Sequence, residues 1–554
     1  MSIRFNCFII SKHKIDLIQY TFISCIITVN TTTMTHLIEN GWIQYAGELP
    51  DDIYCGFDEH DHYGVLSFNT PTTDSNTHEM LYHIKVDVSG SMSDCLRDGR
   101  SKMQLIVHTL TNMLHYFAEN TENVIIQVSG FDDKIHSYIE PTKVSRANVL
   151  SLVAALSTMR PMNMTNIELA LVTISENIEK KVVDVARNRQ VVIFLTDGDS
   201  TVGENEPTKL AELVPGGVSA YFIALGDNHN SDIMYALGHK NPYTSNWFIS
   251  QLEHTGNVYG EILFNEMHRV LEHVDIEVNN GKIFDYMTGT FVANLHIGHL
   301  SSEMKKYYHI VTDNPDECYV TIRGIDSRDG THAEFYASDL PPLVLHEKDI
   351  TTHVELDAHF IQKQFMRLGV QKLMSDLRLH TDTKLERHKC LISLECYDHV
   401  EMPDMDETIE TRREFNRRAR VIKKKINQYM DLHGIAQDEL LCGLIDDLSV
   451  VAKTTADLRR NIRFATARED SQGRQTTFNT VSDMQDEDDL HIGRNLNPPA
   501  LQRAPTSAYT SPGRLNIMRV ISSDVDANES LSPAMIVTPT LSRPNDNALF
   551  MFTP

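Results

Sequence analysis

The sequence lacks the motifs of several common classes of protein. Its eight cysteines are scattered and no two of them form a CxxC pair, so neither a disulfide framework nor a zinc finger is indicated. GxGxxG, GxxxxGK(S/T), HExxH and GxSxG are also absent. Their absence argues against dinucleotide, P-loop, zinc-protease and serine-hydrolase sites.

Positive charge is scarce. The 554 residues contain 50 Lys and Arg against 76 Asp and Glu, a formal net charge of −26. Because phosphate binding draws on clustered positive charge, we expect no nucleic-acid partner; Mg²⁺, Ca²⁺ or basic partners suit this balance better. The basic segment from Arg412 to Lys425 carries an apolar stripe, and we interpret it as a solvated helix that pairs with the acidic body.

Long apolar runs are rare as well. Leu17–Val29 is apolar, but Asp16 interrupts its start, and the run is too short to span a bilayer comfortably. We interpret residues 1–79 as a partly disordered N-terminal extension; a signal, an anchor or a true start at Met34 are the alternatives. Unpaired thiols favour a cytoplasmic protein over a secreted or membrane-anchored one, and no membrane partner is expected.

Alternating strand and helix patterns extend over residues 80–274. Gln190–Thr196 is a continuous apolar run, typical of a strand that is covered on both faces. Val124–Phe131 and Lys134–Ile139 predict a hairpin that adds an antiparallel edge. The pattern predicts an α/β domain with a doubly wound, mostly parallel sheet, ending in a helix over Glu261–His273.

The pattern changes after this domain. Residues 275–350 contain short alternating segments separated by turn signals, which predict a small antiparallel, β-sandwich-like domain. Helical periodicity returns over 351–468 and predicts a helical hairpin or small bundle. Residues 469–554 are polar and rich in Pro, Ser, Asn and Thr, which predicts a disordered tail.

Oxygen-bearing side chains gather in the loops at the carboxyl edge of the predicted sheet. VDVSGSMSD supplies Asp87, Ser89 and Ser91 directly after an apolar strand. PMNMTNIELAL supplies Thr165 before a helix, and FLTDGDSTVGE supplies Asp197 at the end of a buried run. Ligands of doubly wound sheets bind at this edge. Small hydroxyl residues add little to a core, so we interpret them as oxygen donors to a ligand.

This set of residues resembles the metal-ion-dependent adhesion site (MIDAS) of von Willebrand factor A (vWA) domains. In these domains DxSxS, a distant Thr and a distant Asp converge. The resemblance covers about residues 80–274, and the A domain is followed by a β-rich domain and helices, as in some vWA proteins. The sequence departs from the pattern in one loop, where Asn163-Met164 stands in place of the usual Gly-rich turn.

The resemblance implies a role for each of the five residues. Ser89, Ser91 and Thr165 are expected to coordinate a metal ion directly, while Asp87 and Asp197 act largely through water or as anchors behind the ligands. Mg²⁺ is the expected ion, with Ca²⁺ or Mn²⁺ as alternatives. An open coordination position would accept an Asp or Glu from a protein partner.

The function that follows is a non-enzymatic, Mg²⁺-dependent protein–protein interaction module. Several alternatives remain open. Asp87 and Asp197 would in the simplest case only cap helices. Asp87 would otherwise be the nucleophile of a metal-dependent phosphoryl-transfer hydrolase, although Ser89 stands where such sites carry a second Asp. In a third alternative the chain is a structural scaffold with a vestigial metal site.

Overall fold

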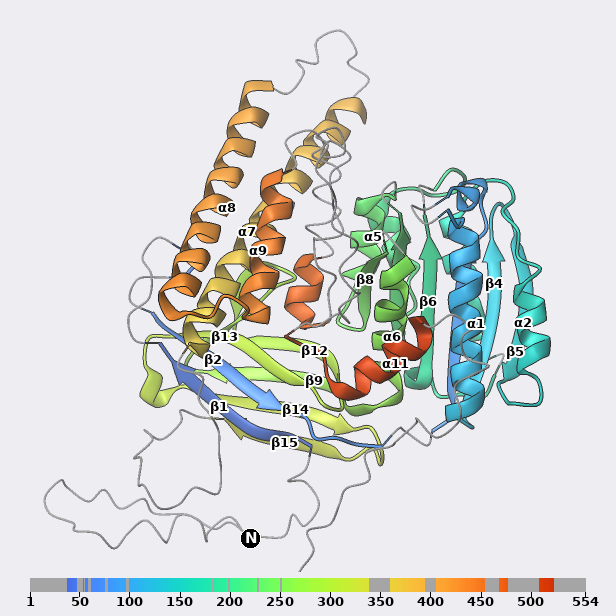
Figure 1. The fold of residues 1–554 in the computed structure, drawn as a ribbon, viewed down its shortest axis with the longest axis horizontal. Helices are drawn as coiled ribbons and strands as arrows, with labels where there is room; N and C mark the ends of the chain where they lie inside the picture. The colour runs from blue at the N-terminus through green and yellow to red at the C-terminus, as the bar shows by residue number, and fades with distance from the viewer. Residues whose placement is uncertain are drawn as a thin grey trace, which may run out of the picture.

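In the computed structural model of the protein, the described residues are 37–46, 53, 55–57, 61–74, 78–95, 99–181, 183–197, 200–226, 229–249, 252–337, 359–393, 405–453, 468–476 and 508–522. The apolar run Leu17–Val29 lies outside them. They form an α/β domain, a pair of antiparallel sheets and a layer of long helices (Figure 1). No helix among these residues is long and apolar enough to cross a membrane.

The α/β domain is built on a six-stranded sheet of order β5-β4-β3-β6-β7-β8. Only the β4–β5 pair is antiparallel, as expected from the predicted hairpin. The fold is therefore α/β with a mostly parallel sheet, as predicted. The strands are β3 (Met80–Asp87), β4 (Val124–Phe131), β5 (Ile135–Lys143), β6 (Gln190–Thr196), β7 (Ser219–Leu225) and β8 (Thr244–Ile249).

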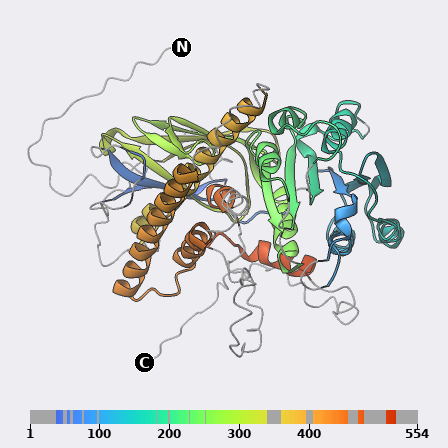
Figure 2. The same ribbon diagram turned by 90° about the horizontal axis from the view of Figure 1, so that it is seen from above.

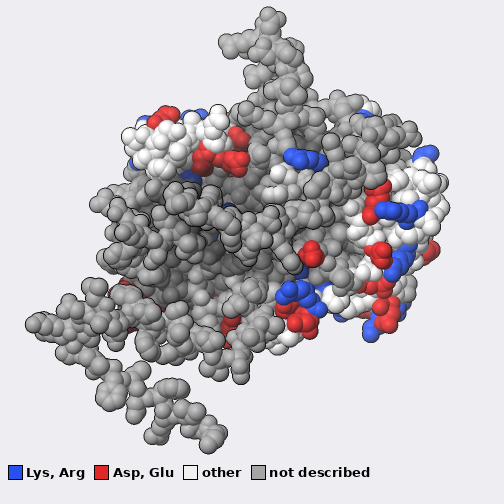
Figure 3. All heavy atoms as spheres, turned by 60° about the horizontal axis from the view of Figure 1, so that its bottom comes forward, with Lys and Arg blue, Asp and Glu red and all other residues white. Residues whose placement is uncertain are grey.

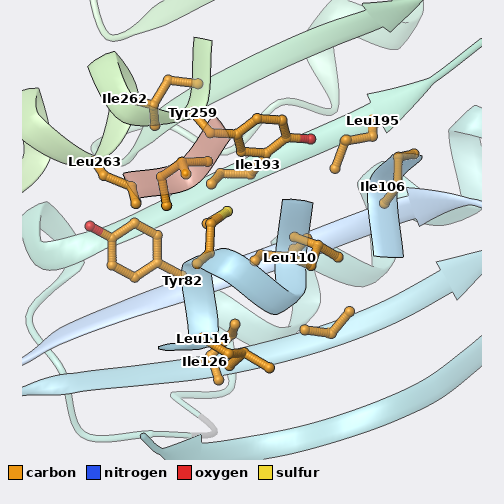
Figure 4. Packing of buried hydrophobic residues seen from close by; sticks show 14 of the residues in the cluster. Tyr82, Ile106, Leu110, Leu114, Ile126, Ile193, Leu195, Tyr259, Ile262 and Leu263 are labelled. Atoms are coloured by element: carbon orange, nitrogen blue, oxygen red, sulfur yellow. The ribbon is translucent and has the colours of Figure 1, made fainter. Parts of the chain in front are cut away.

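Helices cover both faces of this sheet. Strand side chains alternate between the two faces, so Tyr82 packs with α1 and α6 while Phe194 packs with α3 and α5. Figure 4 shows Tyr82 and Ile193 packed among Leu110, Leu263 and their neighbours in the first of these cores. The helices are α1 (Lys102–Asn120), α2 (Val149–Leu156), α3 (Ile167–Glu179), α4 (Pro207–Glu212), α5 (Ser231–Gly238) and α6 (Leu252–Met267).

Two antiparallel sheets pack face to face as a β-sandwich. One has the order β1-β2-β13-β10-β11 and the other β12-β9-β14-β15. Apolar side chains of both, including Phe68, Ile276 and Ile310, share one core. The strands are β1 (Glu39–Tyr45), β2 (His62–Asn69), β9 (Arg269–Asn279), β10 (Lys282–Asp285), β11 (Thr290–Val292), β12 (Asn294–Ser301), β13 (Lys305–Thr312), β14 (Tyr319–Asp326) and β15 (His332–Ala337).

The structure corrects two expectations at the start of this sandwich. Residues 1–79 are not only an extension, because β1 and β2 lie in the five-stranded sheet and β2 pairs with both β1 and β13. The helix expected over Glu261–His273 ends earlier, at Met267, and the strand β9 begins at Arg269. The α/β domain is therefore inserted into the β-sandwich, between β2 and β9.

Long helices cover the outer face of the five-stranded sheet (Figure 2). They are α7 (Phe360–Ser393), α8 (Met405–His433) and α9 (Glu439–Lys453). The predicted apolar stripe of α8 is buried at Phe415, Ala419, Ile422 and Ile426. On the opposite side of α8, basic residues are exposed, although Arg418 pairs with Asp376 of α7 at 2.8 Å. On the face shown in Figure 3, described Lys and Arg side chains lie among Asp and Glu side chains.

Two segments of the expected disordered tail are ordered, which corrects that expectation for residues 469–476 and 508–522. The helix α11 (Pro512–Ser522) packs on α6 and α1 of the α/β domain (Figure 1). The approach is close: a Cβ atom added to Gly260 of α6 would lie 2.7 Å from the Cα atom of Met518. The buried Arg514 lies 3.6 Å from Glu261 of α6. The rest of the expected tail lies outside the described residues.

Candidate metal site

The first loop of the candidate site leaves the carboxyl end of the central strand β3. Asp87, the last residue of β3, is fully buried. Its Oδ1 accepts a hydrogen bond from the Ser89 backbone N–H at 2.8 Å, and its Oδ2 accepts one from the Thr196 hydroxyl at 2.7 Å. Asp87 thus fixes the start of the loop and ties it to the end of β6. A short 3₁₀ turn follows, with Met92 buried beneath it.

Hydrogen bonds connect this loop to the third loop of the site. Ser89 Oγ and Ser91 Oγ are 3.0 Å apart, and the Ser91 hydroxyl donates to Asp197 Oδ1 at 2.7 Å. Asp197 follows β6 directly and is 1% exposed. The structure therefore brings Asp87, Ser89, Ser91 and Asp197 together in one continuous cluster.

The Thr165 loop is held beside the other two through its backbone. The N–H of Gly90 donates to the carbonyl of Asn163 at 3.1 Å, and the Thr165 N–H donates to Thr201 Oγ1 at 2.9 Å. Thr165 is 4% exposed. Its hydrogen bonds within the described part of the chain all involve backbone atoms. No hydrogen bond of the Thr165 hydroxyl is found among the described residues.

Side chains also fix the Asn163 loop, whose shape the sequence left open. Asn163 Nδ2 donates to the buried Asp132 at 3.4 Å, and Asp132 Oδ1 accepts hydrogen bonds at 2.8 Å from the Lys134 N–H and from His136 Nε2. The β4–β5 turn thus supports this loop. Asp132 thus connects the β4–β5 turn to the loop that carries Thr165.

Burial dominates the electrostatics of Asp87. Removal from water raises its pKa to about 6, because the hydrogen bonds from Ser89 and Thr196 offset only part of the desolvation and the charge of Asp197 adds to it. A bound cation would favour the ionised carboxylate. This buried acidic group fits a site whose charge is balanced by a metal ion.

The donor set fits a small, hard cation. It consists of hydroxyl and carboxylate oxygens, the ligands that Mg²⁺ prefers. Among the described residues no group of three or more His, Cys, Asp and Glu side chains is arranged to hold a metal ion. The connected side chains of Asp87, Ser89, Ser91 and Asp197, with the Thr165 loop beside them, form the candidate metal site.

Sequence reasoning missed one charged residue of the site. The ammonium group of Lys102, the first residue of α1, lies 2.6 Å from Asp197 Oδ2. The sequence carried only a weak signal for it: a cation in the first turn of a helix is slightly unfavourable next to the helix dipole. The identity of the partner of Lys102 depended on the tertiary structure.

Comparisons with known proteins identify the family of the α/β domain. Residues 84–258 match the family model of the von Willebrand factor type A domain. A curated relative, the inter-alpha-trypsin inhibitor heavy chain H3 of Rattus norvegicus, is 30% identical over 165 residues; the match covers 28% of this chain and only 18% of that protein.

The chain also shows limited similarity to two solved structures. The ArnB paralog VWA2 from Sulfolobus acidocaldarius is 12% identical, with a TM-score of 0.44, over 79% of this chain and 99% of that chain. The proximal thread matrix protein 1 from the mussel byssus, with a zinc-occupied MIDAS motif, is 16% identical, with a TM-score of 0.29, over 38% of this chain and 51% of that chain. Together with the family match, the sheet topology leads to one conclusion: the chain contains a von Willebrand factor A domain.

Proposed function

We propose that the protein is a non-enzymatic interaction module that binds a protein partner through a divalent metal ion, most suitably Mg²⁺. Ser89, Ser91 and Thr165 would hold the ion directly, and Asp87 and Asp197 would anchor these ligands. The metal supplies a Lewis-acidic position that an Asp or Glu of the partner can complete. The chain's own residues orient this position, and the buried Asp87 and Asp197 lie beneath it, away from solvent.

The observation that carries the proposal is the hydrogen-bonded chain from Asp87 through Ser89 and Ser91 to Asp197. It connects the carboxyl ends of β3 and β6, two neighbouring parallel strands. A helix cap would require only one loop, whereas here side chains from separate loops converge. Because few carboxylates take part, a bound cation would keep much of its positive charge for the partner.

The same geometry favours an interaction site over phosphoryl transfer. A nucleophilic Asp needs one oxygen free to attack a phosphorus atom. Both oxygens of Asp87 accept hydrogen bonds, and the residue is fully buried. This arrangement suits an anchor better than a nucleophile.

The rim of the site supports a protein partner. Met164 is 57% exposed and Met162 is 36% exposed, on either side of Asn163. Their loop is pinned by backbone hydrogen bonds, including one from the Met162 N–H to the carbonyl of Val88 at 2.6 Å. Methionine side chains adapt to varied apolar surfaces. We infer that they contact the partner beside its acidic residue.

Isothermal titration with MgCl₂ tests the metal site. We expect Ser91→Ala to weaken binding at least about tenfold, because it removes one hydroxyl ligand. Ser93→Ala is the matched control: Ser93 lies in the same turn, is exposed, and donates only to the carbonyl of Gly90 at 2.7 Å. Equal affinities of the two variants would reject the assignment.

Partner binding needs a separate test. Immobilised wild-type protein should retain a partner from a cell extract when Mg²⁺ is present and release it when EDTA is added. Asp197→Ala protein should retain none of that partner in either buffer. Retention that is indifferent to both EDTA and the substitution would instead favour a scaffold with a vestigial metal site.

A further inference from the structure

Lys102 is a buried cation that forms an ion pair with Asp197 of the candidate metal site. It is 6% exposed although it begins a helix. Its Nζ lies 2.6 Å from Asp197 Oδ2 and 3.5 Å from Asp94 Oδ2. The Asp94 side chain is 60% exposed, whereas that of Asp197 is fully buried. The buried partner, Asp197, therefore determines where the ammonium group lies.

The surrounding structure is shaped to hold this side chain. Gly226 follows β7 with a φ angle of +73°, and a Cβ atom there would lie 3.1 Å from Lys102 Cε. The passage for the lysine is thus formed by α1, the end of β6 and the turn after β7. A glycine at 226 both permits the positive φ angle and leaves room for the lysine stem.

Helix formation does not explain the lysine. A positive charge in the first turn of α1 is unfavourable next to the helix dipole, and burying an ammonium group is unfavourable unless it is paired. Capping of α1 is already provided by Ser101 and Gln104, which form a reciprocal capping box. The contact with Asp197 is therefore the interaction that keeps Lys102 in place.

The charges show what this contact does to a metal ion. Asp87 and Asp197 are the buried carboxylates of the cluster, and Lys102 brings one positive charge to the second of them. A divalent ion at the neighbouring hydroxyls would meet this ammonium group at short range and in a buried setting, where like charges repel strongly. The single negative charge of Asp197 can balance the ammonium group or half of the charge of a divalent ion, but not both cations together.

We propose that Lys102 is a tethered cation that competes with the divalent ion for Asp197. It lowers the metal affinity of the site and keeps the loops folded when metal is scarce. This inference rests on the proposed function, because it concerns the same metal site. Competition from Lys102 would make the fraction of protein that binds its partner depend on the concentration of free Mg²⁺.

The test compares wild-type protein with Lys102→Met, which keeps an unbranched side chain only one atom shorter and removes its charge. Lys180→Met is the control for net charge, because Lys180 forms an exposed pair with Glu176 on α3. Titration with MgCl₂ alone should show binding that is at least about tenfold tighter in Lys102→Met than in wild type and unchanged in Lys180→Met.

Thermal unfolding provides a readout that does not need a partner. In EDTA, Lys102→Met should melt below wild type, because Asp197 loses its counter-charge, and saturating Mg²⁺ should restore the melting temperature. Wild type should respond less to Mg²⁺. Lys102→Gln, which can still donate to Asp197, provides a second neutral variant if Lys102→Met does not fold.

The outcomes separate this inference from the proposed function. Binding of Mg²⁺ by the neutral variants but not by wild type would support the inference in its strongest form. If wild type binds Mg²⁺ and the neutral variants bind it with equal or lower affinity, the inference is wrong. The metal site would then stand, and Lys102 would only position Asp197. No binding by any of the proteins would overturn both.

Discussion

The vWA domain and the β-sandwich of this chain contain similar elements but are put together differently. The vWA sheet uses one continuous stretch from β3 to α6, while the sandwich joins β1 and β2 to strands that begin only at β9. Folding of the sandwich therefore closes a long loop, and the folded vWA domain shortens that loop by holding its ends. The continuous domain should depend less on the interrupted one than the reverse.

The chain contains two Trp residues, and each reports on one of these regions. Trp42 lies in β1 of the sandwich and Trp247 in β8 of the vWA sheet. Variants with a single Trp, obtained by replacing the other with Phe, allow the unfolding of each region to be followed separately by fluorescence.

The largest effect is expected from cavities in the two cores. Phe194→Ala in β6 should destabilise the vWA domain by about 3–5 kcal/mol, because Phe194 is fully buried against Phe131 and Phe222. It should also lower the urea midpoint seen by Trp42, because an unfolded insert raises the entropy cost of closing the sandwich.

Phe68→Ala is the matched change in the sandwich. Phe68 is fully buried and stacks on Tyr308 with a ring separation of 5.9 Å, so a loss of similar size, about 3–5 kcal/mol, is expected. Its effect should appear mainly at Trp42. If the two substitutions shift both probes equally, the regions unfold as one unit and the asymmetry does not exist.

The next effect concerns α11, which packs on the vWA domain although it lies far from it in sequence. Ile517 and Ile521 of α11 belong to the same core as Tyr82 and Leu263. A helix that follows the β-sandwich and the helical layer in sequence thus completes the core of the vWA domain. Arg514→Met should destabilise this docking by about 3–5 kcal/mol, because it removes a buried positive charge that lies 3.6 Å from the buried carboxylate of Glu261.

Hydrogen exchange of α11 and urea unfolding followed at Trp247 measure this effect. Adding Glu261→Gln to Arg514→Met should recover part of the loss, because the buried carboxylate that faced Arg514 is then replaced by a neutral amide. A double variant no more stable than Arg514→Met alone would show that the ion pair is not what holds α11.

A smaller, pH-dependent effect distinguishes the helical layer from the vWA site. Asp447 of α9 is buried beside Arg468 and accepts a hydrogen bond from Gln472 at 2.9 Å, and burial raises its pKa to about 6. The folded state thus keeps a proton that the unfolded chain releases near pH 4. The free energy of unfolding should therefore fall as pH rises from about 4 to about 6.

Asp447→Asn should remove the contribution of Asp447 to this pH dependence. That contribution is on the order of 2–3 kcal/mol of unfolding free energy between about pH 4 and about pH 6. Urea unfolding at several pH values, followed at Trp42, measures it. The pKa of Asp87 is also raised. The pH dependence of the free energy of unfolding that is followed at Trp247 should therefore persist in Asp447→Asn. Identical slopes at Trp42 in both proteins would refute the assignment to Asp447.

The smallest effects are expected at exposed apolar residues. Leu150 of α2 is 74% exposed and Tyr336 of β15 is 66% exposed. Leu150→Lys and Tyr336→Lys should each change stability by no more than about 0.5 kcal/mol. A larger loss from either one in thermal unfolding would reveal an interface that covers that residue.

The two regions also differ in how much of them the sequence predicted. In the vWA domain, strands such as Gln190–Thr196 and the alternation of strands and helices were recognised because their signals are local. In the sandwich, β1 and β2 were missed. Their partners lie across the inserted domain, and an eight-residue strand such as His62–Asn69 carries only a weak pattern by itself.

The sequence by itself indicated the α/β class and the alternating segments of the second region, since these follow from residue type and periodicity over short distances. It also placed five oxygen-bearing residues in loops at one edge of the sheet, and the resemblance to vWA domains gave them their predicted role. Only the tertiary structure decided that the vWA domain interrupts the sandwich, that α11 completes its core and that Lys102 pairs with Asp197. These contacts join residues far apart in the chain. Burial and charge pairing select them among many alternatives that local sequence leaves equally open.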